Sequence, residues 1–336
     1  MEEQLSQTKS KTFLIVAPRF TSKSAGVVTL YTLADILGQL GHVVYVVRPG
    51  FSKSIGKNFR QISFFHYMFK WKQLKKGIAV YHESIFGEPL QTEHFVKYLL
   101  NIPGGVRSPK YTLKGPNIWS YSKEIARLSN APIKKILFLP VSDPNFFRPR
   151  NGARSKQPLA YSGKHQIIPA ELPIGAKIIS RYGKQAPNRD ELVNLLQTHE
   201  ELHVWENTAV ALEATLCGCI CIFHINRDFQ FPFALDELGP SGYAYFSEEN
   251  SIALAKNNVK NVRDVYLKLW NARVNQVSLF VDRIDLNHPV SPKVTSLRPP
   301  LLVGLMGRLE GVCRLGGLKE LTSHIGSAVR SRFSMR

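Results

Sequence analysis

Cysteines, acidic residues and long apolar runs are all scarce in this chain. Its 336 residues include four cysteines: Cys217, Cys219 and Cys221 lie close together, and Cys313 lies far from them. This spacing forms neither a disulfide framework nor two paired clusters of zinc ligands, so we expect reduced thiols in the core of a cytosolic protein.

No run approaches the roughly 18–20 apolar residues that a membrane-spanning helix needs. The polar start, MEEQLSQTKSKTFLIVAP, has no cleavage site after its short apolar run, so we expect no signal peptide.

Acidic residues are outnumbered, with 25 Asp and Glu against 44 Lys and Arg, which gives a formal net charge of +19. Such a charge suits nucleic acid, an anionic membrane surface or a polyanionic substrate. The charge is spread along the chain, and no zinc-finger spacing, RNP-like aromatic motif or helix-turn-helix accompanies it. Nucleic acid is therefore not the expected partner.

Two successive series of predicted strands and helices indicate an α/β fold with two domains. In the first series, apolar runs predict strands, helical spacing predicts a helix over 27–41, HFVKYLLN is predicted to be helical, and a last strand breaks into a proline-rich turn at 134–149. The predicted strands are 11–18, 41–49, 77–84 and 116–122. The second series alternates in the same way and ends in one or two amphipathic helices over 252–284. Its earlier segments are 158–166, 176–183, 188–199 and 201–205.

These series predict domains at 1–150 and 151–285, followed by a basic, leucine-rich tail at 286–336. Leucines recur at helical spacing in this tail, and cationic residues outnumber acidic ones. The tail is either an interfacial helix lying on anionic lipid or a helix that packs back on the body of the protein.

The segment WENTAVALEATLCGCICIF, residues 205–223, indicates chemistry most directly. A polar turn of Glu206, Asn207 and Thr208 precedes an apolar helix that carries one glutamate, Glu213. A helix N-terminus favours an anion, and a carboxylate can hold paired hydroxyl groups. A diphosphate together with ribose hydroxyls describes a nucleotide.

Six segments resemble, in the same order, motifs of GT-B glycosyltransferases of the family-4-like retaining group (group 1), of which the chain looks like a divergent member. The resemblance covers residues 12–226. The segments are SAGVVTLYTLADILGQLGHVVYVV, YHES, IWSYSKEI, LPVSDPNFFRP, YSGK and ENTAVALEATLCGCICIF. Two departures stand out: Glu206 and Glu213 are separated by six residues instead of seven, and Ser84 replaces the proline of a His-Glu-Pro sequence.

The resemblance implies a GT-B fold, in which two Rossmann-like domains face a cleft, and it assigns roles to residues in both. Lys164, Arg181 and the helix start near Thr208 would stabilise the leaving diphosphate, with Glu206 and Asn207 nearby. Glu213 would bind the ribose hydroxyls. In the N-terminal domain, Gly26 would let the first loop approach the donor. His82 would contact the donor sugar, and Glu83 would serve as the base if transfer inverts.

The implied activity is that of a glycosyltransferase of the hexosyltransferase type. It would move a sugar from a nucleoside-diphosphate sugar to a glycan or lipid-linked acceptor, with retention, in polysaccharide biosynthesis. Protein cations would replace an obligatory metal, and no other cofactor is expected. We expect a cytoplasmic protein, peripheral on the inner face of the plasma membrane. The alternatives are a GT-B sugar-nucleotide epimerase and a non-catalytic nucleotide- or nucleic-acid-binding protein.

Overall fold

The computed structural model describes residues 10–48, 57–85, 87–104, 113, 115–164, 172–183, 186–227 and 229–287. These residues divide into two compact units. Unit 1 holds the described residues up to Ser120, then Leu128–Lys135, and those from Phe280 onward; unit 2 holds Tyr121–Arg127 and Ile136–Leu279. The predicted boundary after residue 150 falls within unit 2. The predicted helical tail, apart from residues 286 and 287, lies outside the described residues, as does Cys313.

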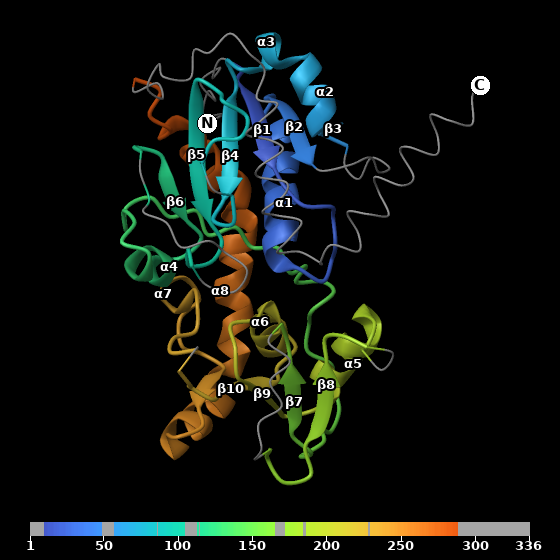
Figure 1. Cartoon of the computed structure of the whole chain (residues 1–336). Coiled ribbons are helices and arrows are strands. Elements are labelled where there is room, and N and C mark those ends of the chain that lie inside the picture. The colour runs from blue at the N-terminus through green and yellow to red at the C-terminus, as the bar shows by residue number, and fades with distance from the viewer. Residues whose placement is uncertain are drawn as a thin grey trace, which may run out of the picture. The chain divides into compact units, whose positions relative to one another are not determined.

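Unit 1 is built on a six-stranded sheet in the order β3-β2-β1-β4-β5-β6, and every paired neighbour runs parallel. Its strands are β1 (Thr12–Val16), β2 (Val43–Arg48), β3 (Arg60–Ser63), β4 (Ile78–His82), β5 (His94–Leu99) and β6 (Ile118–Ser120). The apolar runs form central strands because both faces of a parallel sheet are covered: Phe13, Leu14 and Ile15 of β1 are fully buried. The predicted helix is α1 (Ala25–Gln39), which packs against β2 (Figure 1).

One element of unit 1 was predicted wrongly. HFVKYLLN was expected to be a helix, but it contains β5, which lies between β4 and β6. The prediction was wrong because one lysine within an apolar run gives the same sequence pattern as the polar face of an amphipathic helix. Here Lys97 is buried, and its ammonium group donates hydrogen bonds to the carbonyl oxygens of Ile85 (2.7 Å) and Gly87 (2.9 Å). Two short helices, α2 (Phe64–Phe69) and α3 (Trp71–Leu74), were not predicted.

Unit 2 has a five-stranded parallel sheet in the order β11-β10-β9-β7-β8. Its strands are β7 (Leu159–Ser162), β8 (Lys177–Ser180), β9 (Glu201–Val204), β10 (Ile220–Phe223) and β11 (Tyr243–Tyr245). The expectation of an α/β fold with two parallel, Rossmann-like sheets is thus confirmed (Figure 1). The segment Leu137–Leu139, expected to form a strand, is buried but belongs to no strand among the described residues.

The helices of unit 2 are α4 (Lys123–Leu128, through Arg127), α5 (Arg189–Thr198), α6 (Ala209–Leu216), α7 (Leu235–Leu238) and α8 (Glu249–Asp282, through Leu279). A capping box between Asn188 and Glu191 begins α5. Helix α8 confirms the predicted amphipathic helix as one continuous element of 34 residues. Cys217, Cys219 and Cys221 are free and buried in the core of this unit, as expected. No described helix is long and apolar enough to span a membrane.

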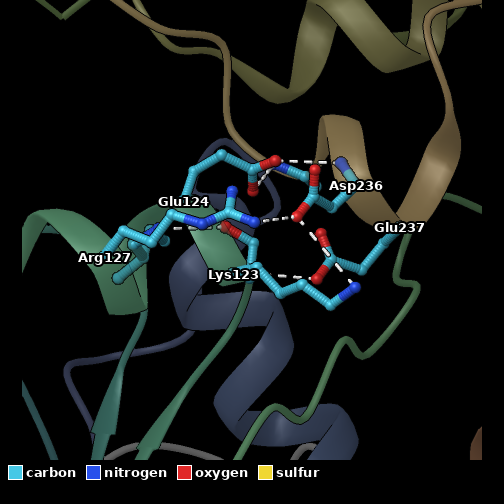
Figure 2. A network of polar contacts seen from close by, with 8 residues as sticks. Lys123, Glu124, Arg127, Asp236 and Glu237 are labelled. Atoms are coloured by element: carbon cyan, nitrogen blue, oxygen red, sulfur yellow. Dashed lines mark hydrogen bonds and ion pairs between the residues drawn. The ribbon is translucent and has the colours of Figure 1, made fainter. Parts of the chain in front are cut away.

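A polar network joins α4 to the short helix α7 (Figure 2). The carboxylate of Glu124 accepts hydrogen bonds from the backbone N–H groups of Ala234 (3.0 Å) and Asp236 (2.9 Å). The backbone N–H of Lys123 donates to Glu237 (3.0 Å), and Arg127 pairs with Asp236 at 2.6 Å. The N–H groups at the start of a helix have no acceptor within that helix, and the buried carboxylate of Glu124 serves as their acceptor at the start of α7.

Candidate functional site

Each sheet contains a point where the winding of the chain reverses. In unit 2 the chain passes from β7 outward to β8, and then returns to place β9 on the other side of β7. In unit 1 it passes from β1 to β2 and β3, and then places β4 on the other side of β1. Open α/β sheets bind ligands outside the carboxyl ends of the strands at such a reversal. The expected positions are therefore the ends of β7 and β9 in unit 2, and of β1 and β4 in unit 1.

The reversal in unit 2 joins two of the predicted residues directly. Lys164 follows β7 and Glu206 follows β9, and the backbone N–H of Lys164 donates to the Glu206 carboxylate at 2.7 Å. The Glu206 side chain is almost fully buried, with 5% of its residue surface exposed. A Cβ added at Gly163 would lie 2.0 Å from the same carboxylate oxygen, Oε1. Only glycine fits there while Glu206 stays in place, so the two loops are locked to each other.

Tyr161 of β7 lies among the other predicted groups of unit 2. Burial raises the pKa of its hydroxyl, and the charge of Arg181 and a hydrogen bond with Thr208 lower it in part. Glu206 and Glu213 raise the same pKa, which places both carboxylates within electrostatic range of this ring. Arg181 directly follows β8, and its backbone N–H donates to the carbonyl oxygen of Ser162, next to Tyr161, at 2.9 Å.

Tyr161 was not predicted as a site residue. It belongs to YSGK, one of the segments that resemble the transferase motifs. Its position two residues before Gly163, at the end of a strand, is the signal that could have identified it.

Helix α6 begins beside this group and carries Glu213. Thr208 caps the helix, because its hydroxyl accepts a hydrogen bond from the backbone N–H of Val210 at 3.3 Å. The Glu213 carboxylate accepts from the hydroxyl of Ser142 at 3.2 Å. Burial raises the pKa of Glu213 to about 7, against the lowering effects of Arg189 and Ser142. A carboxyl group with this pKa changes its charge near neutral pH, so a ligand that needs the carboxylate must hold it ionised.

Ser142 and Arg189 were missed by sequence reasoning. Ser142 stands in the LPVSDPNFFRP segment, and both its backbone groups bond the hydroxyl of Tyr266. Arg189 is the first residue of α5, and its guanidinium lies over the rings of Phe146 (4.9 Å) and Phe147 (5.3 Å). Arg189 has no local pattern that distinguishes it from an ordinary surface residue. Ser142 stands in a recognised segment, but its contact with Glu213 joins residues that are 71 positions apart.

Asn207 uses its side chain within the protein. Its amide nitrogen donates to the carbonyl oxygen of Phe231 at 2.8 Å, and its amide oxygen accepts from the backbone N–H of Phe233 at 2.8 Å. Both ends of the amide therefore tie the turn before α6 to the loop at 231–233. The structure places Asn207 next to Glu206 and Thr208 in the chain, but its side chain positions this loop.

The three predicted residues of unit 1 lie at the reversal of its own sheet. Gly26 is the second residue of α1, and a Cβ there would meet Leu100 at 3.6 Å, an ordinary contact. Glu83 follows β4, is buried, and accepts a hydrogen bond from the backbone N–H of Leu100 at 3.0 Å. Gly26 and Glu83 are thus both close to Leu100, which follows β5.

His82 ends β4 as a neutral hydrogen-bond donor. Burial and, to a smaller extent, the charge of Lys97 together lower its pKa to about 4. Its Nδ1 accepts from the backbone N–H of Ser84 at 3.3 Å, which assigns the ring proton to Nε2. No group of three or more His, Cys, Asp or Glu side chains that could hold a metal ion occurs among the described residues of either unit.

No protein-family model and no curated protein sequence matches the chain. Solved structures similar to it include a glycosyltransferase from Rickettsia africae ESF-5, with 14% identity over 83% of this chain and 96% of that chain and a TM-score of 0.42. WaaG, a glycosyltransferase involved in lipopolysaccharide biosynthesis, is 10% identical over 82% of this chain and 96% of that one, with a TM-score of 0.44. A putative UDP-N-acetylglucosamine 2-epimerase from Listeria monocytogenes is 8% identical over 98% of both chains, with a TM-score of 0.42. The function is therefore argued from the residues at the two reversal points.

Proposed function

We propose that unit 2 binds a nucleoside-diphosphate sugar and that the chain is a GT-B glycosyltransferase of the hexosyltransferase type. The observation that carries this proposal is the lock between Lys164 and Glu206 at the reversal of the unit 2 sheet. It brings a cation, a buried carboxylate and the start of α6 to one edge of the sheet, where such folds bind ligands. Anionic diphosphate and neutral hydroxyls are the two ligand groups that this combination suits.

The diphosphate is assigned to the positive groups. Lys164 and Arg181 follow neighbouring strands, β7 and β8, and the capped start of α6 adds the partial charge of a helix N-terminus. As the glycosidic bond breaks, charge grows on the diphosphate, and positive groups already in place stabilise that growth. Because protein cations can do this, we propose that no divalent metal is obligatory.

Glu213 is assigned to the ribose hydroxyls and Glu206 to the hydroxyls of the donor. Hydrogen bonds from hydroxyls favour the ionised form of Glu213, whose pKa near 7 otherwise leaves it half protonated at neutral pH. Nucleotide binding would then lower this pKa. Glu206 is fixed by the backbone of Lys164, so it would be held in the same place whether or not ligand is bound.

In unit 1 we assign His82 to a donor role in hydrogen bonding, because its neutral ring carries the proton on Nε2. Transfer with retention then needs no carboxylate base from this unit. Glu83 would be that base only if transfer inverts, and its hydrogen bond with Leu100 holds it at the end of β4. The proposed acceptor is a glycan or lipid-linked glycan of polysaccharide biosynthesis, reached at the cytoplasmic face of an anionic membrane, which the net charge of +19 suits.

Calorimetric titration with UDP, GDP, ADP and TDP tests the nucleotide site. We expect one nucleotide to bind the wild type clearly better than the rest, and Glu213→Ala and Lys164→Ala to lose that binding. Glu248→Ala is the matched control, since Glu248 is an exposed carboxylate of the same unit. If no nucleotide binds the wild type, or if the control loses as much affinity as Glu213→Ala, the assignment of this site is wrong.

Turnover assays then separate the activities. A glycosyltransferase releases nucleoside diphosphate faster when the correct acceptor is added. Consumption of the donor without an acceptor, with release of a new sugar, would identify an epimerase instead. Binding of nucleotide without turnover of any sugar donor would identify a non-catalytic protein. Salt-dependent affinity for DNA or RNA, with no nucleotide binding, would identify a nucleic-acid-binding protein.

A further inference from the structure

One segment of unit 1 is basic and aromatic and has no acidic residue. Residues 57–76, KNFRQISFFHYMFKWKQLKK, contain six Lys and Arg residues and no Asp or Glu. They also contain six aromatic residues of the Phe, Tyr and Trp types. The segment includes the edge strand β3 and the helices α2 and α3; α2 packs against β3 and β2, and α3 packs against α2 (Figure 1).

Helices α2 and α3 divide their aromatic residues between the core and the solvent. Tyr67, Trp71 and Leu74 pack into a core cluster of unit 1. Phe65 and Phe69, by contrast, are 51% and 90% exposed, respectively. They are four residues apart in one helix and so lie on the same face. An isolated exposed apolar residue is common, but two large rings on one face of a short helix form an apolar patch.

Exposed cationic residues follow this patch in the chain. Lys70 comes directly after Phe69, and Lys72 and Lys76 follow within the next six residues; all three are exposed. Exposed phenylalanines beside lysines are the composition of protein surfaces that lie in the interface of an anionic bilayer. The aromatic rings enter the boundary of the acyl chains, and the ammonium groups stay at the level of the lipid phosphates.

A surface hollow adjoins the same helix. It has a volume of about 410 Å³, and its lining includes Tyr45, Arg60, Gln61, His66 and Lys70. Arg60 and Lys70 give this hollow two cationic side chains. Cationic side chains bind phosphate oxygens with strong, charge-assisted hydrogen bonds, so the hollow suits a phosphate group.

We propose that the surface formed by residues 57–76 docks on an anionic phospholipid bilayer, with Phe65 and Phe69 inserted and a lipid phosphate in the hollow lined by Arg60, Gln61 and Lys70. The proposal places the membrane contact in the described part of unit 1, separately from the leucine-rich tail. It shares with the proposed function only the location at a membrane and does not depend on sugar transfer. A bilayer is favoured over nucleic acid because the two exposed rings form one apolar patch on a helix face, as in helices that lie in a membrane interface. A surface for single-stranded nucleic acid needs only separate aromatic rings, on each of which one base stacks.

Co-sedimentation of the full chain with lipid vesicles tests this proposal. One set of vesicles contains phosphatidylcholine and phosphatidylglycerol, and the other contains phosphatidylcholine alone. The first variant, Lys70→Ala with Lys72→Ala, should weaken binding to the anionic vesicles about 30-fold, because each cation near such a surface contributes about 1 kcal/mol. The second variant, Phe65→Ser with Phe69→Ser, should weaken it by at least about tenfold, since apolar surface no longer leaves the water.

Matched controls come from exposed positions on α8 of unit 2. Lys260→Ala with Lys268→Ala removes the same charge, and Leu254→Ser removes a side chain of a residue that is 60% exposed. We expect both to bind vesicles like the wild type. Urea denaturation of all variants should show wild-type unfolding transitions, which demonstrates that they are folded whether or not a nucleotide binds. Calorimetric titration should show that they keep whatever nucleotide affinity the wild type has.

Three results would overturn the proposal. The first is wild-type vesicle binding by both unit 1 variants, as expected if the tail alone held the membrane. The second is an equal loss in the α8 controls, which would show a general charge effect. The third is a loss with the lysine variant but not with the phenylalanine variant, together with tight binding of an oligonucleotide. If vesicle binding follows the expectation while no nucleotide binds the wild type, the docking surface stands and only the transferase proposal fails.

Discussion

Gly163→Ala tests the lock between the two loops of unit 2 most directly. The new Cβ would lie 2.0 Å from Oε1 and 2.5 Å from Cδ of Glu206, and 3.0 Å from Cε1 of Tyr161. Contacts that short cannot persist, so Glu206 must move. The carboxylate is the end of a flexible side chain, but it can leave only by giving up the hydrogen bond from the backbone N–H of Lys164.

The hydrogen bond that is lost sets the scale of the cost. A hydrogen bond to a charged group contributes about 1.5–3 kcal/mol to stability. We therefore expect Gly163→Ala to lower the free energy of unfolding by about 2 kcal/mol in urea denaturation. Nucleotide affinity should fall as well, because the cation and the carboxylate would no longer be held at the same edge of the sheet. The control is Gly26→Ala, which meets Leu100 only at 3.6 Å and, as an alanine in a helix, should not destabilise the protein.

A double-mutant cycle can refute this reasoning. In a Glu206→Ala background the clashing atoms are absent, so Gly163→Ala should cost little there. The difference between the two backgrounds measures the lock itself. A loss below about 0.5 kcal/mol in the wild type, or the same loss in both backgrounds, would show that Glu206 does not require glycine at position 163.

Three further changes have definite expected outcomes. The pKa of Glu213 is raised to about 7 in the native state. Between about pH 4.5 and 7 the native state therefore holds a proton on Glu213 that the unfolded state has lost, and the free energy of unfolding falls as pH rises through this window. Glu213→Gln should match the wild type at pH 5 and exceed its stability at pH 8 by about 3 kcal/mol in urea denaturation, and an equal difference at both pH values would contradict this. Lys97→Met removes the hydrogen bonds to Ile85 and Gly87, so amide exchange after β4 should quicken while nucleotide affinity is kept; unchanged exchange would show that Lys97 does not hold this loop. Glu124→Ala leaves two backbone N–H groups at the start of α7 without their acceptor, so it should lower the free energy of unfolding by about 2–4 kcal/mol in thermal or urea unfolding (Figure 2). Arg127→Ala is the control: it removes the half-exposed ion pair with Asp236 and should cost less than about 1 kcal/mol, and equal losses would refute the capping role of Glu124.

Strands with a continuous apolar run could be predicted from the sequence, because burial on both faces of a parallel sheet leaves that local mark. β1, β2 and β4 are examples. β5 could not, since the partners of its buried Lys97 are carbonyl oxygens of a loop that precedes it in the chain. β3 was not predicted either, because its sequence, RQIS, contains a single apolar residue and so shows no apolar run.

The candidate site was predictable as a set of residue types but not as a set of contacts. Glu206 and Thr208 could be named because a polar turn before an apolar helix is a local pattern. Asn207 belongs to the same pattern, yet its amide serves the loop at 231–233, which no local rule indicates. Ser142 was missed for the corresponding reason: its partner, Glu213, lies 71 residues later in the chain.

The strand order explains why the missing information is long-range. Lys164 and Glu206 are 42 residues apart, and they meet only because β9 returns to the side of β7 opposite β8. If β9 had paired with β8 instead, Glu206 would follow a strand beside Arg181 and not beside Lys164. The apolar runs that predict the strands are the same in both orders. What distinguishes them is Gly163, which is required only when the Glu206 carboxylate reaches across to β7. Among the described residues, Gly163 is therefore a local trace of this sheet order, and its substitution tests the contact between the ends of β7 and β9.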